Sequence, residues 1–323
     1  MTKAIRVHSY GGPDVMKWED VPTPEPGPGE ALVKQEAIGL NYIDVYFRTG
    51  LYKAPAIPVT IGMEGAGTVI AVGQGVPDIA VGDRVAYAGA LGAYATERVI
   101  AADRLVKLPP GIDTKTAAGM MLQGMTAQYL IRRTYKVKAG DTIVVHAAAG
   151  GVGLILGQWA RHLGATVIGV VSTPEKSEFA KANGVAHTVI GHDTLVSEVK
   201  RVTNGAMVPV VYDSIGKDTF PISLDCLAPL GLMVSYGNAS GAVPPLDISI
   251  LAAKGSLYLT RPNLATYTAK RQDLLATAND LFSVVQSGAV KIHVNQTFPL
   301  KDAAQAHTAL ESRQTTGSTV LLP

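Results

Sequence analysis

Cysteine is almost absent from this chain. Cys226 is the only cysteine among 323 residues, which excludes an internal disulfide framework and any multi-cysteine metal site. It lies in the segment from Leu224 to Pro229, where a buried core thiol is expected rather than a nucleophile.

An excess of one charge and long uncharged apolar runs are lacking as well. The formal net charge is only +2, so nucleic acid is not expected as a partner. No uncharged stretch reaches the ~20 apolar residues that a membrane-spanning helix needs. The chain also does not open with a basic and apolar signal sequence. These features predict a cytoplasmic protein without a membrane span, and the length suggests two domains.

The clearest positive signal lies in the middle of the chain. An apolar run from Ile143 to Val145 predicts a buried strand, and the glycine turn Gly150-Gly151-Val152-Gly153 leads into apolar residues at helical spacing. A second β-branched run, Thr166 to Val171, predicts the next strand. Strand, turn, helix and strand form a βαβ unit, whose helix N-terminus offers N–H groups and a partial positive charge to a phosphate.

The glycine turn departs from the G-x-G-x-x-G nucleotide fingerprint. If Gly150 and Gly153 are its second and third glycines, the first falls on Ala148. Gly150 still lets the backbone approach a pyrophosphate, and Gly153 still lets helix and strand pack closely. A glycine triplet is often just a tight turn without a ligand. Here the strand–turn–helix–strand context favours a cofactor site.

The residues after the second strand indicate which cofactor binds. NAD sites usually place an acidic residue roughly 20 positions beyond the glycines, to bind the ribose 2′-hydroxyl. Here the strand continues as Ser172-Thr173-Pro174-Glu175-Lys176. Hydroxyls and a lysine suit a 2′-phosphate, and Glu175 after Pro174 fits the first turn of the next helix. Ser172 and Thr173 could instead only cap that helix, with Lys176 in solvent, but we predict NADP(H).

Strands and helices continue to alternate after this unit, which predicts a doubly wound parallel sheet. Ligands of such sheets lie beyond the carboxyl ends of the strands. Asp213-Ser214 and Gly237-Asn238 follow two predicted strands and are candidates for ribose and nicotinamide contacts. The first hundred residues differ, because short strands punctuated by glycine favour an antiparallel barrel or sandwich. A helical stretch from Lys115 to Arg133 carries the expected boundary between the two.

Several motifs resemble those of one family, the zinc-independent medium-chain dehydrogenase/reductases, and among them the NADPH:quinone oxidoreductases related to zeta-crystallin. The resemblance spans essentially the whole chain. The motifs that carry it are Asn41-Tyr-Ile-Asp44 through Arg48-Thr-Gly-Leu-Tyr52, Gly62-Met-Glu-Gly-Ala-Gly67, Leu122-Gln-Gly-Met-Thr-Ala127, the segment Ala147 to Gly153, Tyr212-Asp-Ser-Ile-Gly216 and Leu310-Glu-Ser-Arg313.

The resemblance implies the architecture. It implies an α/β fold, with a GroES-like antiparallel β-barrel in a catalytic domain over residues 1–125 and a Rossmann domain that binds NADP(H) over 126–264. Residues 265–323 would return to complete the catalytic domain, and the active site would lie in the cleft between the domains. The family commonly forms homodimers through the edges of the Rossmann sheets. The strand near Ser256 to Thr260 is the candidate edge.

The resemblance also bears on zinc, because zinc alcohol dehydrogenases share this fold. They have a cysteine ligand where this chain has Asn41, and a histidine in Gly-His-Glu where this chain has Met63. An amide and a thioether cannot replace a thiolate and an imidazole at a catalytic zinc. We therefore expect no metal. Without a Lewis acid, a quinone or conjugated enone is the expected substrate, because its π system delocalises the charge that hydride addition creates.

Catalytic and cofactor-binding roles follow in part from the resemblance. Asn41 is expected to hold the nicotinamide ribose or a substrate oxygen. Tyr52 and then Tyr46 are candidates to donate a hydrogen bond or proton, although both rings could merely line an apolar pocket. The predicted cofactor-binding residues are Asn41, Thr126, Ala149, Gly150, Gly151, Val152, Gly153, Ser172, Thr173, Lys176, His192, Ser214, Gly237, Asn238 and Arg313.

His192 departs from the family pattern, which often has tyrosine there. We hypothesise that a protonated His192 near the 2′-phosphate tightens NADPH binding as the pH falls. His307, in contrast, is expected to be a packed, hydrogen-bonded residue and not a catalyst.

The function that follows is NADPH-dependent quinone reduction. The alternative is reduction of 2-enals or enoyl thioesters on the same scaffold. A non-enzymatic NADPH- or RNA-binding protein is the third hypothesis, and the near-neutral charge disfavours its RNA form.

Overall fold

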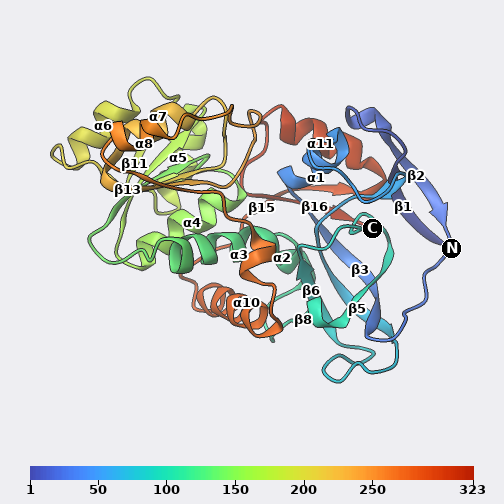
Figure 1. Ribbon diagram of the computed structural model, residues 1–323. Coiled ribbons are helices and arrows are strands. Elements are labelled where there is room, and N and C mark those ends of the chain that lie inside the picture. Colours follow the sequence, from blue (N-terminus) through green and yellow to red (C-terminus); the bar gives the residue numbers. More distant parts are fainter. The chain divides into compact units, whose positions relative to one another are not determined.

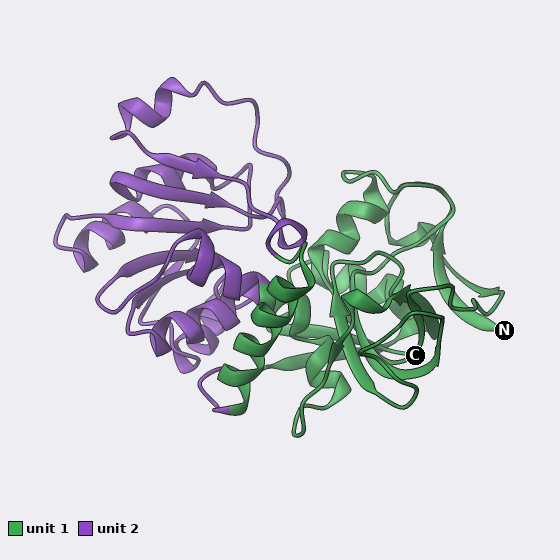
Figure 2. Cartoon of the chain, turned by 60° about the horizontal axis from the view of Figure 1, so that its bottom comes forward, with its two compact units in different colours: residues 1–125, 268–286, 292–323 green, residues 126–267, 287–291 purple.

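The computed structural model describes residues 1–323 and divides the chain into two compact units (Figure 2). Unit 1 comprises Met1–Met125, Thr268–Gln286 and Ile292–Pro323, and unit 2 comprises Thr126–Tyr267 and Ser287–Lys291. The first division falls inside helix α3 (Met121–Tyr129), within the helical stretch where the sequence places it. The second lies three residues beyond the expected 264/265, and residues 287–291 belong to unit 2 and not to the return segment.

Unit 2 is built on a parallel sheet of six strands in the order β11-β10-β9-β12-β13-β14 (Figure 1). From β9, strands β10 and β11 follow towards one edge of the sheet. From β12, strands β13 and β14 follow towards the opposite edge. The strand order therefore reverses between β9 and β12, and this is the topological switch point where such sheets bind ligands. The strands are β9 (Thr142–His146), β10 (Thr166–Val171), β11 (His187–Ile190), β12 (Val208–Asp213), β13 (Leu227–Ser235) and β14 (Tyr258–Thr260).

Helices alternate with these strands as the sequence predicts. They are α4 (Gly151–His162), α5 (Pro174–Ala182), α6 (Leu195–Val202), α7 (Phe220–Asp225), α8 (Ser249–Ala253) and α9 (Leu264–Tyr267). The β-branched strand residues and the apolar faces of α6 and α7 share one buried cluster, which includes Val144, Val170, Leu195 and Leu224. Cys226 belongs to this cluster. Its burial raises the pKa of the thiol to about 12, so it is the inert core residue that was expected.

Unit 1 contains a second, mixed sheet in the order β15-β16-β3-β5-β6-β8, with β7 also paired to β3. Its strands are β3 (Glu30–Leu40), β5 (Glu64–Val72), β6 (Arg84–Ala88), β7 (Glu97–Ala101), β8 (Val106–Lys107), β15 (Val294–Pro299) and β16 (Ser318–Leu322). The pairs of this sheet are antiparallel, as expected for the GroES-like domain, except that β15 and β16 are parallel. Helix α11 (Ala303–Glu311) makes the crossover that a parallel pair needs.

A small sheet in the order β2-β1-β4 completes unit 1. It consists of β1 (Thr2–Val7), β2 (Met16–Val21) and β4 (Val59–Thr60). The remaining helices are α1 (Tyr42–Thr49), α2 (Thr114–Ala118) and α10 (Arg271–Gln286). The helix expected over 115–133 is interrupted after α2, where Gly119 forms the C-cap, and its end, Leu130–Thr134, is a π-helical turn.

None of the helices is both long enough and apolar enough to cross a membrane.

Candidate functional site

The glycine turn of unit 2 has the geometry of a phosphate-binding helix N-terminus. Gly150 is the extended N-cap of α4, and no side chain caps this end of the helix. The N–H groups of Gly151, Val152 and Gly153 therefore lack the intrahelical partners that later residues have. Ala149 is buried beside them. These donors and the positive end of the helix dipole fit the diphosphate of a dinucleotide.

Close packing explains the last glycine of the turn. A Cβ on Gly153 would collide with the carbonyl oxygen of Ala147 and come within 2.9 Å of the Cα of Ala148. The same carbonyl accepts a hydrogen bond from the Gly150 N–H at 2.9 Å. Ala147 itself has a left-handed φ of +51°, which costs a non-glycine residue about 1 kcal/mol. The backbone here is tightly fixed, as a preformed phosphate site requires.

Helix α5 begins where the sequence predicts. Thr173 is its N-cap and accepts a hydrogen bond from the Lys176 N–H at 3.3 Å, with Pro174 in the first turn. Glu175 is exposed in that first turn. It therefore does not stand directly at the end of β10, where a ribose-binding carboxylate is expected. Capping occupies the Thr173 hydroxyl, whereas the Ser172 side chain is exposed and the Lys176 side chain is half-buried.

Two loops lie side by side at the ends of β12 and β13. The carboxylate of Asp213 is fully buried and accepts hydrogen bonds from the N–H groups of Ile215 at 2.8 Å and Gly216 at 3.0 Å. The Tyr236 N–H donates to the Asp213 carbonyl at 2.8 Å. A Cβ on Gly237 would come within 2.8 Å of the Cα of Ser214. The structure therefore brings the predicted residues Ser214, Gly237 and Asn238 together at the switch-point edge.

Arg261 supports this edge and was not predicted from the sequence. It follows β14 and donates through one guanidinium nitrogen to the carbonyls of Ser235 at 2.8 Å and Gly237 at 3.0 Å. An arginine directly after an edge strand was the available signal, but nothing in the sequence placed it against the neighbouring strand's loop.

His192 follows β11 and lies near a second histidine. Its ring centroid is 5.9 Å from that of His146, the last residue of β9. His146 is fully buried, and its ring shares a 2.9 Å hydrogen bond with the Ser223 hydroxyl. Burial lowers the pKa of His146 to about 4, which keeps the imidazole neutral. Sequence reasoning missed His146 because it reads as one polar residue at the end of an apolar strand.

In unit 1, Asn41 is buried at the start of α1 and its amide is held on both sides. Its Nδ2 donates to a carboxylate oxygen of Glu64 at 2.7 Å, and its Oδ1 accepts from Gln123 Nε2 at 3.1 Å. The other Glu64 oxygen accepts from the Leu122 N–H at 2.8 Å. In this arrangement both Glu64 oxygens accept from N–H groups, and the Asn41 amide directs its nitrogen to Glu64 and its oxygen to Gln123. Glu64 and Gln123 lie within the family motifs at residues 62–67 and 122–127, but their supporting role was not predicted.

A second buried carboxyl lies next to Asn41. Asp44 accepts from the Asn41 backbone N–H at 2.9 Å in a capping box and from the Tyr94 hydroxyl at 3.0 Å. Burial raises the pKa of Asp44 to about 7, and burial together with the nearby Asp44 raises that of Glu64 to about 8. Asn41 is therefore hydrogen-bonded to two carboxyl groups that retain their protons at pH values far above the usual range for carboxyls.

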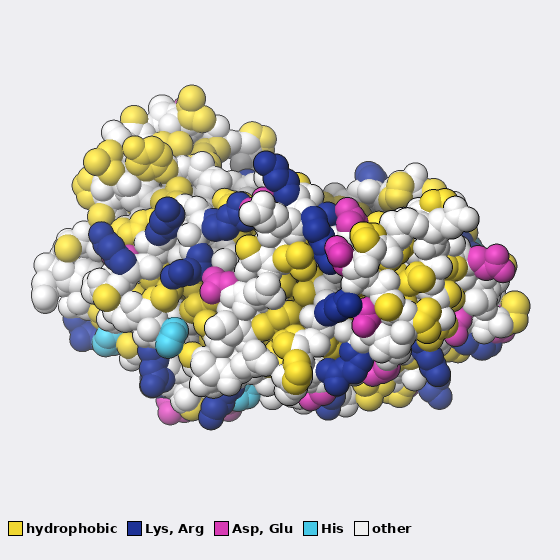
Figure 3. Space-filling model, turned by 90° about the horizontal axis from the view of Figure 1, so that it is seen from below, with side chains coloured by type: hydrophobic (Ala, Val, Ile, Leu, Met, Phe, Trp, Pro, Cys, Tyr) yellow, Lys and Arg dark blue, Asp and Glu magenta, His cyan; other side chains and the backbone are white.

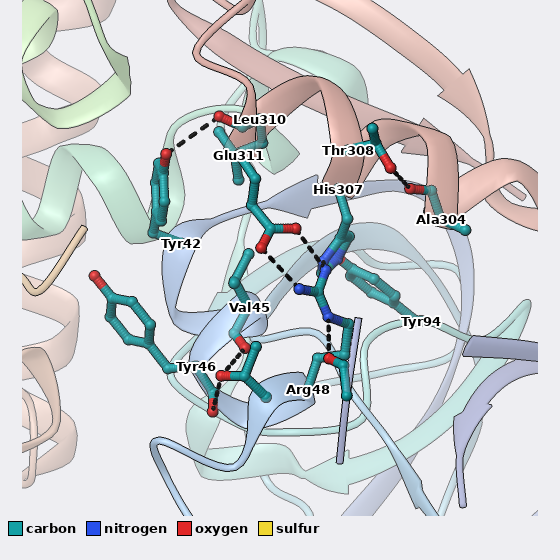
Figure 4. Close-up of polar contacts among 12 residues, drawn as sticks. Tyr42, Val45, Tyr46, Arg48, Tyr94, Ala304, His307, Thr308, Leu310 and Glu311 are labelled. Atoms are coloured by element: carbon teal, nitrogen blue, oxygen red, sulfur yellow. Dashed lines mark hydrogen bonds and ion pairs between the residues drawn. The ribbon is translucent and has the colours of Figure 1, made fainter. Parts of the chain in front are cut away.

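The hydrogen-bond chain continues from Asp44 through Tyr94 to α11, and Figure 4 shows its part from Tyr94 to Glu311. His307 bonds the Tyr94 hydroxyl through Nε2 and Arg48 through Nδ1, each at 3.0 Å. Arg48 also forms two 2.8 Å bonds to Glu311. Since arginine only donates, His307 is the neutral Nε2–H tautomer, and burial lowers its pKa to about 3. The prediction that His307 is packed and hydrogen-bonded is confirmed.

The two candidate tyrosines are in contact. The rings of Tyr46 and Tyr52 meet edge to face with centroids 5.2 Å apart, and the Tyr52 N–H donates to the Tyr46 carbonyl at 3.0 Å. Tyr46 is buried, whereas Tyr52 is half-buried. The structure thus groups Asn41, Tyr46 and Tyr52 on and just after α1. Of the remaining predicted residues, Arg313 is exposed in unit 1 with a left-handed φ of +58°, and Thr126 is buried in α3.

The groups around Asn41 and Met63 are an amide, a thioether and two carboxyls bonded to neighbouring N–H and O–H groups. No three His, Cys, Asp or Glu side chains cluster as a metal site anywhere in residues 1–323.

Comparisons with known proteins agree with this architecture. The family model described as "Alcohol dehydrogenase GroES-like domain" matches residues 27–134, and the one described as "Zinc-binding dehydrogenase" matches residues 151–274. A quinone oxidoreductase of Pseudomonas aeruginosa is 52% identical over 325 residues that cover 100% of both chains. A 2-haloacrylate reductase of a Burkholderia species is 46% identical and covers 100% of this chain and 99% of its own. The crystal structure of Escherichia coli quinone oxidoreductase complexed with NADPH is 47% identical, with a TM-score of 0.97 and full coverage of both chains.

The chain therefore belongs to the medium-chain dehydrogenase/reductases, which combine a GroES-like domain with a Rossmann domain. The absence of the cysteine and histidine ligands at Asn41 and Met63 separates it from the zinc alcohol dehydrogenases of that class. Within the class, its family is that of the quinone oxidoreductases.

Proposed function

We propose that this protein is an NADPH-dependent quinone reductase. The observation that carries the proposal is the full-length match to quinone oxidoreductases, one of them solved with NADPH, combined with an uncapped helix N-terminus on a doubly wound sheet. NADPH, when bound, supplies a hydride from its nicotinamide ring. The protein has to bind the nucleotide, orient the substrate and satisfy the oxygen that gains charge.

The chain offers residues for each of these tasks. The N–H groups of residues 151–153 suit the diphosphate. Lys176 and Ser172 suit the 2′-phosphate, and the loops at Ser214 and Asn238 suit the nicotinamide end. Asn41 has its amide fixed by Glu64 and Gln123, which holds it in one orientation toward a ribose or substrate oxygen. Arg313 and Thr126 are proposed as further cofactor contacts on the resemblance alone.

Reduction of conjugated acids or enals is the second candidate. It is favoured by the 46% identical relative named 2-haloacrylate reductase. Steady-state NADPH oxidation with 1,4-benzoquinone, 9,10-phenanthrenequinone, 2-hexenal, crotonyl-CoA and 2-chloroacrylate distinguishes the two. We expect the quinones to be the best substrates, and turnover of only the enal, thioester or acrylate would contradict the quinone assignment.

Lys176 is expected to distinguish NADPH from NADH. Lys176→Ala should weaken NADPH binding about 10- to 100-fold, because a charge-assisted hydrogen bond contributes roughly 1.5–3 kcal/mol, and should leave NADH binding nearly unchanged. Lys181→Ala is the matched control, since Lys181 lies on the same helix but pairs with Glu178 at 3.0 Å. Fluorescence titration with both nucleotides measures the effect. Equal losses for NADPH and NADH would show that Lys176 does not contact the phosphate.

Tyr52 is expected to assist protonation where the substrate cannot take its proton easily from water. Tyr52→Phe should lower kcat for 2-hexenal by about 10²-fold, the lower end of general acid catalysis, with a much smaller effect on quinones. Tyr46→Phe is the control, because its hydroxyl belongs to a buried ring packed against the same side chain. If Tyr52→Phe leaves kcat unchanged for both substrates, the two rings serve only as a pocket wall.

A homodimer is proposed through β14. This strand lies at the edge of the unit 2 sheet, and Tyr258 and Leu259 are 61% and 40% exposed. Pairing of two such edges would cover these side chains and the unpaired backbone groups. Sedimentation should show a dimer that Tyr258→Asp/Leu259→Lys converts to a monomer, whereas Ile70→Lys, a change at an equally exposed apolar residue of unit 1, should leave the dimer intact. A wild-type monomer would contradict this.

Nucleic acid and membranes are not proposed as partners. Lys and Arg side chains are spread over the face drawn in Figure 3 with Asp and Glu among them, which differs from the concentrated basic surface of nucleic-acid-binding proteins. A cytoplasmic location remains our expectation.

A further inference from the structure

Three buried groups of unit 2, Asp213, Ser223 and His146, form a directional hydrogen-bond chain that ends beside the ring of His192. It begins at Asp213, whose carboxylate accepts from two backbone N–H groups, from the Thr219 hydroxyl and, at 2.8 Å, from the Ser223 hydroxyl. Ser223 has a single hydrogen to donate. With that hydrogen directed to Asp213, its oxygen must accept from His146 Nε2–H across their 2.9 Å contact.

This arrangement fixes the tautomer of His146. Its hydrogen is on Nε2, so Nδ1 carries a lone pair and can only accept. Burial lowers the pKa of His146 to about 4, so protonation does not reverse this assignment at neutral pH. The Nδ1 atom is enclosed by protein with no hydrogen-bond donor. A buried acceptor without a donor is unfavourable, and the ring of His192 lies beside that of His146, with the centroids 5.9 Å apart.

His192 lies where the 2′-phosphate is expected. Strands β10 and β11 are paired up to Val171 and Ile190, so Ser172-Thr173 and Gly191-His192 leave adjacent strands side by side. The centroids of the two histidine rings are 5.9 Å apart and the rings are inclined at 47°, so a slight approach of the rings, together with a rotation, would bring their nitrogens to hydrogen-bonding distance. His192 Nδ1 is enclosed and without a partner, while the ring as a whole is half-buried. Nε2 is therefore the nitrogen that a ligand can reach.

We propose that His192 is a specificity residue for NADPH that takes up a proton when the 2′-phosphate binds, with His146 as its positioning residue. His146 requires a hydrogen on His192 Nδ1, and the phosphate requires a hydrogen on Nε2. A neutral imidazole has only one N–H, so only the doubly protonated ring serves both acceptors. NADH, which has no 2′-phosphate, makes no such demand. This inference rests on the proposed NADPH-dependent function.

The charged residues on the neighbouring elements are Asp193 on the same loop, Asp213 behind His146, Lys176 on α5 and Glu198 on α6. Glu198 on α6 is occupied by a two-pronged pair with Arg201, at 2.7 and 2.8 Å. The 2′-phosphate dianion is therefore the new charge that favours the doubly protonated His192 ring when NADPH binds.

Calorimetric titration tests the proposal. NADPH and NADH are titrated into the protein at about pH 7 in buffers of different ionisation enthalpy. The slope of the binding enthalpy against the buffer ionisation enthalpy gives the number of protons taken up. Phosphate monoesters titrate near 6, so His192→Asn, which removes the titrating ring but keeps a hydrogen-bonding amide, provides the baseline. We expect wild type to take up a large fraction of one proton more with NADPH than His192→Asn does, and no such difference with NADH.

Controls separate this proposal from the function on which it rests. His187→Asn changes a partly exposed histidine of β11 and should retain the wild-type uptake. Nitrogen-15 NMR of the imidazoles checks the mechanism, because His192 should show two protonated nitrogens with NADPH bound and His146 a bare Nδ1. Binding of NADPH with the same proton uptake in wild type and His192→Asn would overturn the inference alone. Absence of heat with either nucleotide would overturn the proposed function.

Discussion

Gly153→Ala is expected to reduce NADPH affinity at least 100-fold. The new Cβ would collide with the carbonyl oxygen of Ala147 and lie 2.9 Å from the Cα of Ala148. Both neighbours are backbone, so no side chain can move aside. The N-terminus of α4 must shift away from β9, and the N–H groups of residues 151–153 then lose their common direction. Overpacking of this kind costs typically 1–3 kcal/mol and sometimes more, so stability should fall as well.

Gly157→Ala is the matched control on the same helix. Its Cβ would meet only the Val185 Cγ2 atom at 3.2 Å, which a small side-chain adjustment relieves, while alanine gains about 1 kcal/mol in helix propensity. Thermal unfolding and fluorescence titration with NADPH measure both variants. Wild-type affinity in a folded Gly153→Ala protein would show that α4 does not bind the diphosphate.

The elements of unit 2 were predictable because each carries a local signal. The β-branched runs, the glycine turn and Pro174 after Thr173 each specify a strand, a turn or a helix start without reference to the rest of the fold. The start of α5 at Pro174 and the extent of β10 were predicted within a residue. The order of the strands is not local, but alternation restricts it to a doubly wound sheet.

The features that the sequence did not reveal depend on contacts between distant residues. The parallel pairing of β15 with β16 depends on where α11 crosses, and the turn at Gly119 interrupts a run of good helix formers. The supports of the candidate site are of the same kind. Glu64 is 23 residues from Asn41, and His146 is 77 residues from Ser223. Only the fold brings such partners together, so periodicity could not identify them.

The buried carboxyls behind Asn41 should make unit 1 less stable as the pH rises above neutral. Burial raises the pKa of Asp44 from 3.8 to about 7 and that of Glu64 from 4.5 to about 8. The folded state therefore holds protons that the unfolded chain releases. The contribution of these two groups to the free energy of unfolding is fully present below about pH 4 and is lost as the pH rises through 7 and 8. His307 acts in the opposite sense. Its pKa is lowered from 6.5 to about 3, so its contribution is complete above 6.5 and is lost on acidification.

Two carboxyls opposed by one histidine give a net decline from about pH 4.5, and the decline becomes steeper above pH 6.5, where His307 no longer compensates. Between about pH 6.5 and 8, Glu64 alone should remove on the order of 2 kcal/mol from the free energy of unfolding, at about 1.4 kcal/mol per pH unit. Urea unfolding of the whole protein across this range should show the loss in wild type and a flatter profile in Glu64→Gln, even if that variant is less stable at pH 6. Glu36→Gln, a change at an exposed carboxyl that accepts bonds from Thr68 and Thr114, should keep the wild-type slope. A wild-type slope in Glu64→Gln would mean that Glu64 is ionised in the folded protein, and that Asn41 is held by a carboxylate rather than by a protonated acid.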